Sequence, residues 1–401
     1  MNRWLVGTGI LGIALAMTPA TAEACGGFFC NGTPAGPTPV VQAAERVMFE
    51  DLGDGMIRAY VQIQYTQQGG VPIGFSWVIP VTSVPELGVA DTATFDQLDQ
   101  ATAPQFRFIN APNTGGGGGG GGVGCAASDG SFARGAPAED GGVRVWEESR
   151  VGDYQTAIIE GDDGEAILQW LADNGYDIPA AAENTIDDYV FTGHLFAAFR
   201  YDPIGPGSGA LPPVVLTYGG LKPCVPIKIT AIASMPVLDV MVLGFGAGRA
   251  RPDPEGEYIE TVPNYDAIRV DFTAPTQTTY ADEVDAAIED AGRHAWVVEH
   301  ASSTGDLGGI TDPEAQAILA RNPYVTRFYT RLTPEQMDVD PEFVFSNEAE
   351  DVNRLHVIDL GARTSGLLTS DETRFAGPPP LVMLMGGAML AIVWRRRRRL
   401  A

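Results

Sequence analysis

Lysine is almost missing from this chain of 401 residues, in which only Lys222 and Lys228 accompany 23 arginines. Acidic residues outnumber basic ones by 51 to 25, and the formal net charge is −26. Such a surface repels phosphate backbones, so nucleic acid is excluded as a partner. The octaglycine at 115–122 lacks the Gly-Lys-Ser/Thr that completes a phosphate-binding loop. We therefore interpret residues 115–124 as a glycine-rich loop without a ligand.

Histidine is scarce as well, and this limits acid–base and metal chemistry. On a strand, His294 and His300 would project from one face, six residues apart and too far to bind one metal ion together. The cysteines have no partner cysteines or histidines at zinc-finger spacing, and no acidic cluster matches a calcium loop. The sequence therefore predicts no metal site and no cofactor.

Cysteine occurs four times, at positions Cys25, Cys30, Cys125 and Cys224. In an exported chain four cysteines indicate two disulfides rather than free thiols. The spacing Cys25-x₄-Cys30 differs from the Cys-x-x-Cys of redox motifs. We favour the pairs Cys25–Cys30 and Cys125–Cys224, although the sequence allows two other pairings.

The N-terminus reads as a secretory signal peptide over residues 1–24. Arg3 precedes an uncharged apolar stretch at 5–17, and small residues end at Ala24. Cleavage after Ala24 makes Cys25 the first mature residue. Acylation of Cys25 is the alternative, but Glu23 fits a lipoprotein signal poorly, so we favour ordinary cleavage.

The C-terminus carries a short apolar segment, 381–394, which runs from Leu381 to Trp394. Five arginines follow it: Arg395, Arg396, Arg397, Arg398 and Arg399. The segment is shorter than the roughly 20 residues of a typical span, but arginines and tryptophan at its end suit the membrane interface. By the positive-inside rule the tail, 395–401, is cytoplasmic and the bulk of the chain is outside. The layout also resembles cleaved bacterial sorting tails, so retention of this single-pass anchor stays open.

The exported domain at 25–370 is more acidic than the whole chain. Without Arg3, Glu23 and the arginines at 395–399, the chain has 19 basic and 50 acidic residues. Its length allows one large domain or two halves, 25–215 and 216–370.

Alternating apolar residues predict strands in both halves, with helices inserted between them. A hairpin is expected at 47–67, and a short helix at 94–102. Residues 153–203 read as a strand-helix-helix-strand module, whose first helix begins at an Asp162/Glu165 capping box and ends at Asn174-Gly175. Further strands are expected at 213–219, 225–234, 238–246, 295–301 and 325–332, and helices at 281–291 and 313–320. The fold class is α+β, a strand-rich mixed sheet domain flanked by the signal peptide and the membrane segment.

Several stretches resemble one bacterial family of exported proteins. They are "CGGFFC", "FSWVIPV", "DYQTAIIEGDDGEAILQWLADNGYDIP", "KPCVPIKIT" and "VTRFYTRLTPEQMDVDPEF". In their residues and in their order along the chain they are similar to the family called domain of unknown function 2330, over nearly the whole exported chain. The resemblance implies one family-wide domain and carries over no catalytic residue.

The leading functional hypothesis is a membrane-tethered envelope domain that binds or supports structure without catalysis. Its partners would be the membrane, through the C-terminal segment, and an envelope protein that the sequence does not identify. The alternative is an extracytoplasmic hydrolase that uses acidic residues with His194 or His300.

Overall fold

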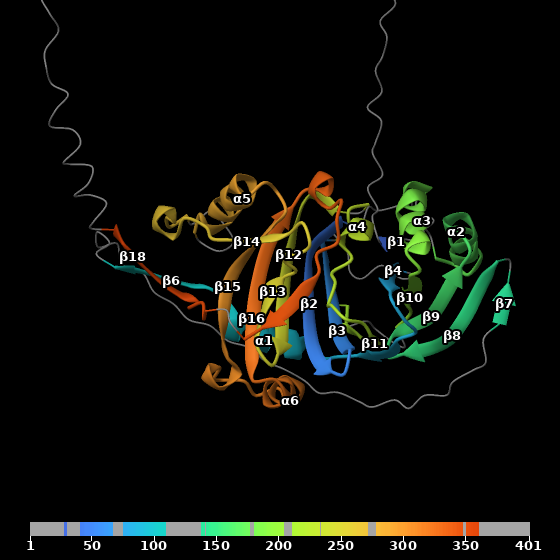
Figure 1. The fold of residues 1–401 in the computed structure, drawn as a ribbon, viewed down its shortest axis with the longest axis horizontal. Coiled ribbons are helices and arrows are strands. Elements are labelled where there is room, and N and C mark those ends of the chain that lie inside the picture. Colours follow the sequence, from blue (N-terminus) through green and yellow to red (C-terminus); the bar gives the residue numbers. More distant parts are fainter. Residues whose placement is uncertain are drawn as a thin grey trace, which may run out of the picture. The chain divides into compact units, whose positions relative to one another are not determined.

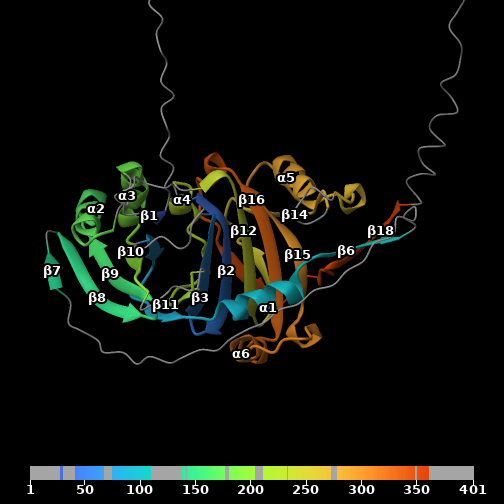
Figure 2. The ribbon, with the colours of Figure 1, turned by 180° about the vertical axis from the view of Figure 1, so that it is seen from behind.

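The computed structural model describes residues 28–29, 41–66, 75–109, 138–140, 142–176, 180–203, 211–232, 234–271, 278–347 and 350–360. Nearly all of them belong to one compact unit, which combines strand-rich mixed sheets with a few helices (Figures 1 and 2). The α+β class is thus confirmed. The expected signal peptide, the glycine-rich loop, Cys25, Cys30, Cys125 and the C-terminal segment lie outside the described residues.

The larger sheet has eight strands in the order β14-β15-β16-β12-β2-β3-β11-β5. Their bounds are β2 Val41–Gly53, β3 Met56–Thr66, β5 Glu86–Val89, β11 Val214–Gly219, β12 Ser234–Gly246, β14 Ile259–Thr261, β15 Ala295–Ser303 and β16 Tyr324–Leu332. β12 pairs with β2 in parallel, whereas β2 and β3 form the expected antiparallel hairpin. Asp54 at its turn has a φ of 52°, a conformation that aspartate tolerates better than most residues.

The smaller sheet has six strands in the order β1-β4-β10-β9-β8-β7, and its paired neighbours are antiparallel. Their bounds are β1 Phe28–Phe29, β4 Ser76–Val81, β7 Ala138–Asp140, β8 Val143–Val151, β9 Tyr154–Gly161 and β10 Leu195–Tyr201. Phe28 is paired with Trp77, and Phe29 with Ser76. Phe28 and Phe29 of the "CGGFFC" motif therefore form an edge strand beside the "FSWVIPV" segment.

Strand alternation divides the apolar residues between three cores. On β10, Leu195 and Phe199 join a central core shared by the two sheets, whereas Phe196 and Ala198 face a second core. On β2, Phe49 faces the central core and Met48 faces a third core. Both sheets are therefore buried on two faces.

Helices supply the outer layers of these cores. α2 (Gly164–Asp173) and α3 (Glu183–Phe191) cover the six-stranded sheet, and α1 (Thr92–Thr102) and α6 (Pro313–Arg321) cover the eight-stranded sheet. Figure 2 shows α1 crossing the strands of the larger sheet. α5 (Tyr280–Asp290) contacts β15 and β16. None of the helices within the described ranges is long and apolar enough to span a bilayer.

The strand-helix-helix-strand module is present as β9-α2-α3-β10, with a shifted helix start. The capping side chain is Asp163, whose Oδ1 accepts the Ala166 N–H at 2.8 Å, and not Asp162. The helix begins at Gly164, so its N-cap is Asp163, one residue later than the sequence predicted. The C-terminal signal is confirmed, because Gly175 has a φ of 81°.

The strand expected at 225–234 is wrong over residues 225–232. Residues Ile227–Thr230 form a single helical turn, α4, and β12 begins only at Ser234. Ile227 and Ile229 alternate as in a strand, yet they enter different cores, because the segment crosses from the central core to the core beneath α2 and α3. Short apolar runs of this kind do not distinguish helix from strand.

Two small ribbons and four single turns complete the described part. β13 (Arg249–Pro252) pairs with β17 (Phe343–Ser346), and β6 (Gln105–Ile109) pairs with β18 (Leu355–Asp359). The 3₁₀ turns are η1 Ala180–Ala182, η2 Tyr265–Ala267, η3 Thr304–Asp306 and η4 Pro334–Gln336. η4 begins with a capping box at Thr333 and Gln336.

Candidate functional site

Charged side chains are buried on the outer face of the eight-stranded sheet, which we define as the face covered by α1 and α6. Alternation places Arg46, Met48 and Glu50 of β2 on this face. Arg46 is 8% exposed and Glu50 is fully buried. A buried charge is costly unless it is paired and hydrogen-bonded, so the partners of these groups decide their role.

Arg46 is held from two sides. Its Nε donates to Gln62 Oε1 on β3 at 2.9 Å, and its Nη2 donates to the same oxygen. On the α1 side, Nη2 lies 2.9 Å from Asp96 Oδ1 and Nη1 lies 3.3 Å from Asp99 Oδ2. The guanidinium also lies over the ring of Phe95, 5.3 Å from its centroid.

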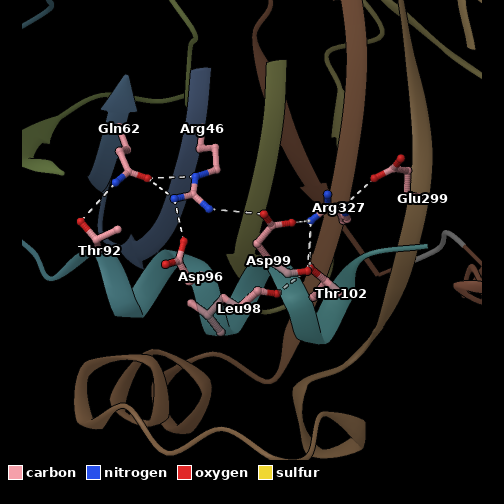
Figure 3. Close-up of polar contacts among 9 residues, drawn as sticks. All are labelled: Arg46, Gln62, Thr92, Asp96, Leu98, Asp99, Thr102, Glu299 and Arg327. Carbon is pink, nitrogen blue, oxygen red and sulfur yellow. Dashed lines mark hydrogen bonds and ion pairs between the residues drawn. The ribbon is translucent and has the colours of Figure 1, made fainter. Parts of the chain in front are cut away.

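Arg327 of β16 completes the cluster, as Figure 3 shows. Its Nη1 donates to Asp99 Oδ1 at 2.6 Å, and its Nε donates to Glu299 Oε2 at 2.5 Å. Burial alone would lower the pKa of Arg327, but the charges of Glu299 and Asp99 outweigh it and raise that pKa. Asp99 thus bridges two arginines from two strands, and together with Glu299 it balances their charge.

The far end of this cluster is closed by Tyr280 of α5. The Tyr280 hydroxyl donates to Glu299 Oε1 at 2.6 Å. Burial, reinforced by the charge of Glu299, raises the pKa of Tyr280 well above its ordinary value. Tyr280 therefore stays protonated and serves as a donor, and the cluster links β2, β3, β15 and β16 to α1 and α5.

A second charged cluster surrounds Glu50 beside α6. Glu50 accepts hydrogen bonds from Tyr60 at 2.8 Å, from Asn322 at 2.7 Å, and from Arg321 at 3.0 and 3.1 Å. Burial alone would raise the pKa of Glu50, but the hydrogen bonds from Arg321 and Tyr60 outweigh it and lower that pKa. Glu50 is consequently a charged anchor for the end of α6.

In both clusters the charged groups bind one another and join strands to helices. Each buried carboxylate accepts from an arginine and from at least one further donor. α1 has few apolar contacts of its own, since its buried residues are Thr94, Phe95, Leu98 and Thr102. Among the described residues there is no group of three histidine, cysteine or acidic side chains that could hold a metal ion.

The histidines are not brought together. His294 Nε2 lies 2.8 Å from Asp338 Oδ1, whereas His300 Nδ1 lies 3.1 Å from the Val352 carbonyl. A register shift between Val298 and His300 interrupts the strand alternation on which their shared face depended. His194 Nδ1 lies 2.9 Å from the Thr192 hydroxyl, and burial lowers the pKa of His194.

His300 has a serine hydroxyl beside it. Ser302 Oγ lies 3.1 Å from His300 Nε2, which is the separation of a serine nucleophile and its base. Both residues are buried, and burial lowers the pKa of His300. The carbonyl of Val352 on Nδ1 would leave Nε2 as the acceptor for the serine hydroxyl.

Cys224 is the one cysteine that the described ranges include, and its thiol is free there. Burial raises its pKa well above the ordinary value. The residue borders a cavity of about 20 Å³ between the sheets, together with Tyr218 and Pro226. That volume holds a single water molecule at most. The expected Cys125–Cys224 disulfide stays a prediction, because Cys125 lies outside the described part.

A larger hollow of about 340 Å³ lies between η3 and α6. Its wall includes Thr304, Leu307, Ile310, Gln316 and Leu319, and no ionisable side chain lines it. The volume is at the lower end of the range for small-molecule pockets. Such a lining suits an uncharged group.

Most of the outer-face residues escaped the sequence interpretation. Arg327 occupies a strand that was expected, and Arg46 directly precedes the expected hairpin at 47–67, but nothing local marks either residue as a partner of a helix at 94–102. The available signal was alternation, because an arginine at an inward strand position requires a buried carboxylate.

A family model described as "Uncharacterized protein conserved in bacteria (DUF2330)" matches residues 19–344. No curated protein matches the chain. One solved structure, a mutated baculovirus P35 after caspase cleavage, aligns with 79% of this chain and 98% of its own, at 8% identity and a TM-score of 0.28. A likeness at that score carries no argument about fold or function.

Proposed function

The chain belongs to the bacterial family DUF2330, and we propose that it is a membrane-tethered domain of the cell envelope that acts by binding or structural support. The observation that carries this proposal is that the buried charges bind one another and hold the helices on the sheet. Asp99 binds Arg46 and Arg327 of different strands, with shortest separations of 3.3 and 2.6 Å. A carboxylate tied in this way holds α1 on the sheet and is poorly placed to exchange protons with a substrate.

The location follows from the sequence of the two ends. An apolar stretch that leads to Ala24, and an apolar segment at 381–394 that precedes five arginines, support export and a C-terminal anchor. The excess of acidic residues favours a solvated surface outside the cytoplasm, and the partner would be another envelope protein. The uncharged hollow between η3 and α6 is a candidate contact for it.

Cell fractionation tests this location. The full chain should accompany the membranes, while a chain that ends at residue 376 should appear in the exported soluble fraction. A matched variant with residues 395–399 changed to glutamine should anchor poorly or insert in the wrong orientation. Full-length protein in the cytosol with residues 1–24 still attached would contradict the proposal.

Hydrolysis is the second candidate, and the Ser302–His300 contact is the observation that favours it. Purified protein would be assayed against ester, peptide and glycoside substrates, beside Ser302→Ala and His300→Asn variants. Under the leading proposal all three proteins show the same background rate. Turnover that falls at least about 100-fold in Ser302→Ala would establish the hydrolase instead.

A further inference from the structure

Lys222 meets two carboxylates at the end of the β13–β17 ribbon. Its Nζ donates to Asp253 Oδ2 and lies 3.5 Å from Glu342 Oε2. Asp253 follows the last residue of β13 directly, and Glu342 precedes the first residue of β17. One amine and two carboxyl groups, from three separate segments, therefore converge at one point.

The backbones that carry these groups are fixed to one another. The Asp253 N–H donates to the Glu342 carbonyl at 2.8 Å, and the Phe343 N–H donates to the Pro223 carbonyl at 2.8 Å. Asp253 is only 5% exposed, and about one third of the Lys222 side chain is accessible. Groups held together in this way react with effective concentrations of about 10⁵–10⁸ M when their orientation is right.

The choice of lysine at this position is informative. The chain has 23 arginines and two lysines. Arginine is the better residue for a fixed ion pair with a carboxylate, since its guanidinium is planar and always charged. An amine differs in one chemical respect, because it becomes a nucleophile once it loses a proton.

We propose that Lys222 and Asp253 condense to an intramolecular amide, with Glu342 carrying the proton. The Glu342 carboxylate removes one proton from the Lys222 ammonium. The neutral Nζ then attacks Cγ of Asp253, the N–C bond forms, and a second Nζ proton passes to the Asp253 oxygen that will leave as water. Glu342 returns its proton to the departing oxygen, and the C–O bond breaks. Ammonium and carboxylate thus become one amide and one water, without oxidant or co-reactant.

The reaction starts from the Lys222–Asp253 ion pair, in which the amine is protonated and the carboxyl group is ionised. The hydrogen bond to Asp253 raises the pKa of Lys222, and the same contact lowers the pKa of Asp253. Proton removal from Nζ is therefore the difficult step, which gives the neighbouring Glu342 its role. The product would join positions 31 residues apart and close this part of the chain covalently.

Mass spectrometry of the full, folded chain tests the proposal. Intact wild-type protein would be compared with a Lys222→Arg variant, which keeps the ion pair but cannot form the amide. Processing at either end cancels in this comparison. The expected difference is the lysine-to-arginine change plus one water. After trypsin digestion, which leaves the Lys222-Pro223 and Arg251-Pro252 bonds intact, peptides 201–228 and 250–269 should be recovered as one species.

Two further variants separate the amide from a simple ion pair. Glu342→Gln should slow amide formation by about 10²–10⁴-fold, the usual contribution of a positioned acid–base group. Lys228→Arg changes the other lysine and should retain the full cross-link. A wild-type chain without the loss of water, and with the two peptides separate, would overturn the proposal.

Discussion

Arg327 and Glu299 face each other from neighbouring strands, with Nε and Oε2 2.5 Å apart and both side chains almost wholly buried. Asp99 and Tyr280 add hydrogen bonds to this pair from α1 and α5. A buried ion pair of this kind contributes little net stability compared with apolar residues of the same volume, but it penalises the loss of either partner. The pair therefore determines where the helices dock more than how stable the sheet is.

Removing one charge of this pair should be severe. We expect Glu299→Ala to lower the free energy of unfolding by about 3–5 kcal/mol, because Arg327 is left buried without its main partner. Urea denaturation measures the loss. The matched control is Asp285→Ala, which removes a half-exposed partner of Arg331 at 2.7 Å and should lower stability by about 0–1 kcal/mol. Equal effects of the two substitutions would contradict the assigned role.

Glu50 should make the protein sensitive to acid. Its pKa in the folded state is lowered from the ordinary value of 4.5, so the unfolded chain binds this proton more tightly. Its stabilising contribution is present above about pH 4.5 and is lost as the pH falls through the lower folded value. In Glu50→Gln, stability at neutral pH should fall, and the further decline below about pH 4.5 should be shallower than in the wild type.

The control for this titration is Glu314→Gln. Glu314 contacts the same Arg321 at 3.2 Å, but its side chain is nearly half exposed. Unfolding free energies would be measured from about pH 3 to neutral pH for the three proteins, which brackets the titration of the carboxyl group. Identical slopes for wild type and Glu50→Gln would show that Glu50 does not produce the acid dependence.

Alanine substitutions at two glycines with positive φ should distinguish the cost of backbone strain from the cost of a steric contact. Gly193 has a φ of 79°, and a Cβ added there would meet no atom within 4 Å, so Gly193→Ala should lose about 1–2 kcal/mol from the backbone alone. Gly175 has a φ of 81°, and its Cβ would lie 2.8 Å from Arg200 Nη1. Gly175→Ala should lose more, because Arg200 must also release the Asn174 carbonyl. Thermal unfolding that ranks the two variants the other way would contradict this reasoning.

Local pattern was sufficient for elements whose signals are short-range. In the hairpin around Asp54, the turn residues lie directly between two segments of alternating apolar residues. In α2, the N-cap and the terminal glycine lie within a few residues of the apolar positions in the sequence. The segment at Ile227–Thr230 failed because alternation there reflects a crossing between two cores. Its conformation depends on the packing of both sheets, which no window of sequence contains.

The pairing of the charged residues on the outer face could not be predicted from local sequence either, because the partners lie far apart along the chain. Asp99 lies 53 residues from Arg46 and 228 residues from Arg327. With 51 acidic residues in the chain, charge alone does not indicate which carboxylates are buried. Arg46 and Arg327 come together only because β12 pairs in parallel with β2 and antiparallel with β16.

Hydrogen exchange in α1 tests most directly whether these charges hold the helix on the sheet. Amide protection would be measured in the full wild-type chain and in the variants Asp99→Asn and Asp96→Asn. Because Asp99 bridges two buried arginines, its substitution should remove protection from α1 while β9 and β10 keep theirs. The more exposed Asp96 should have a small effect. Unchanged protection of α1 in Asp99→Asn would contradict the account.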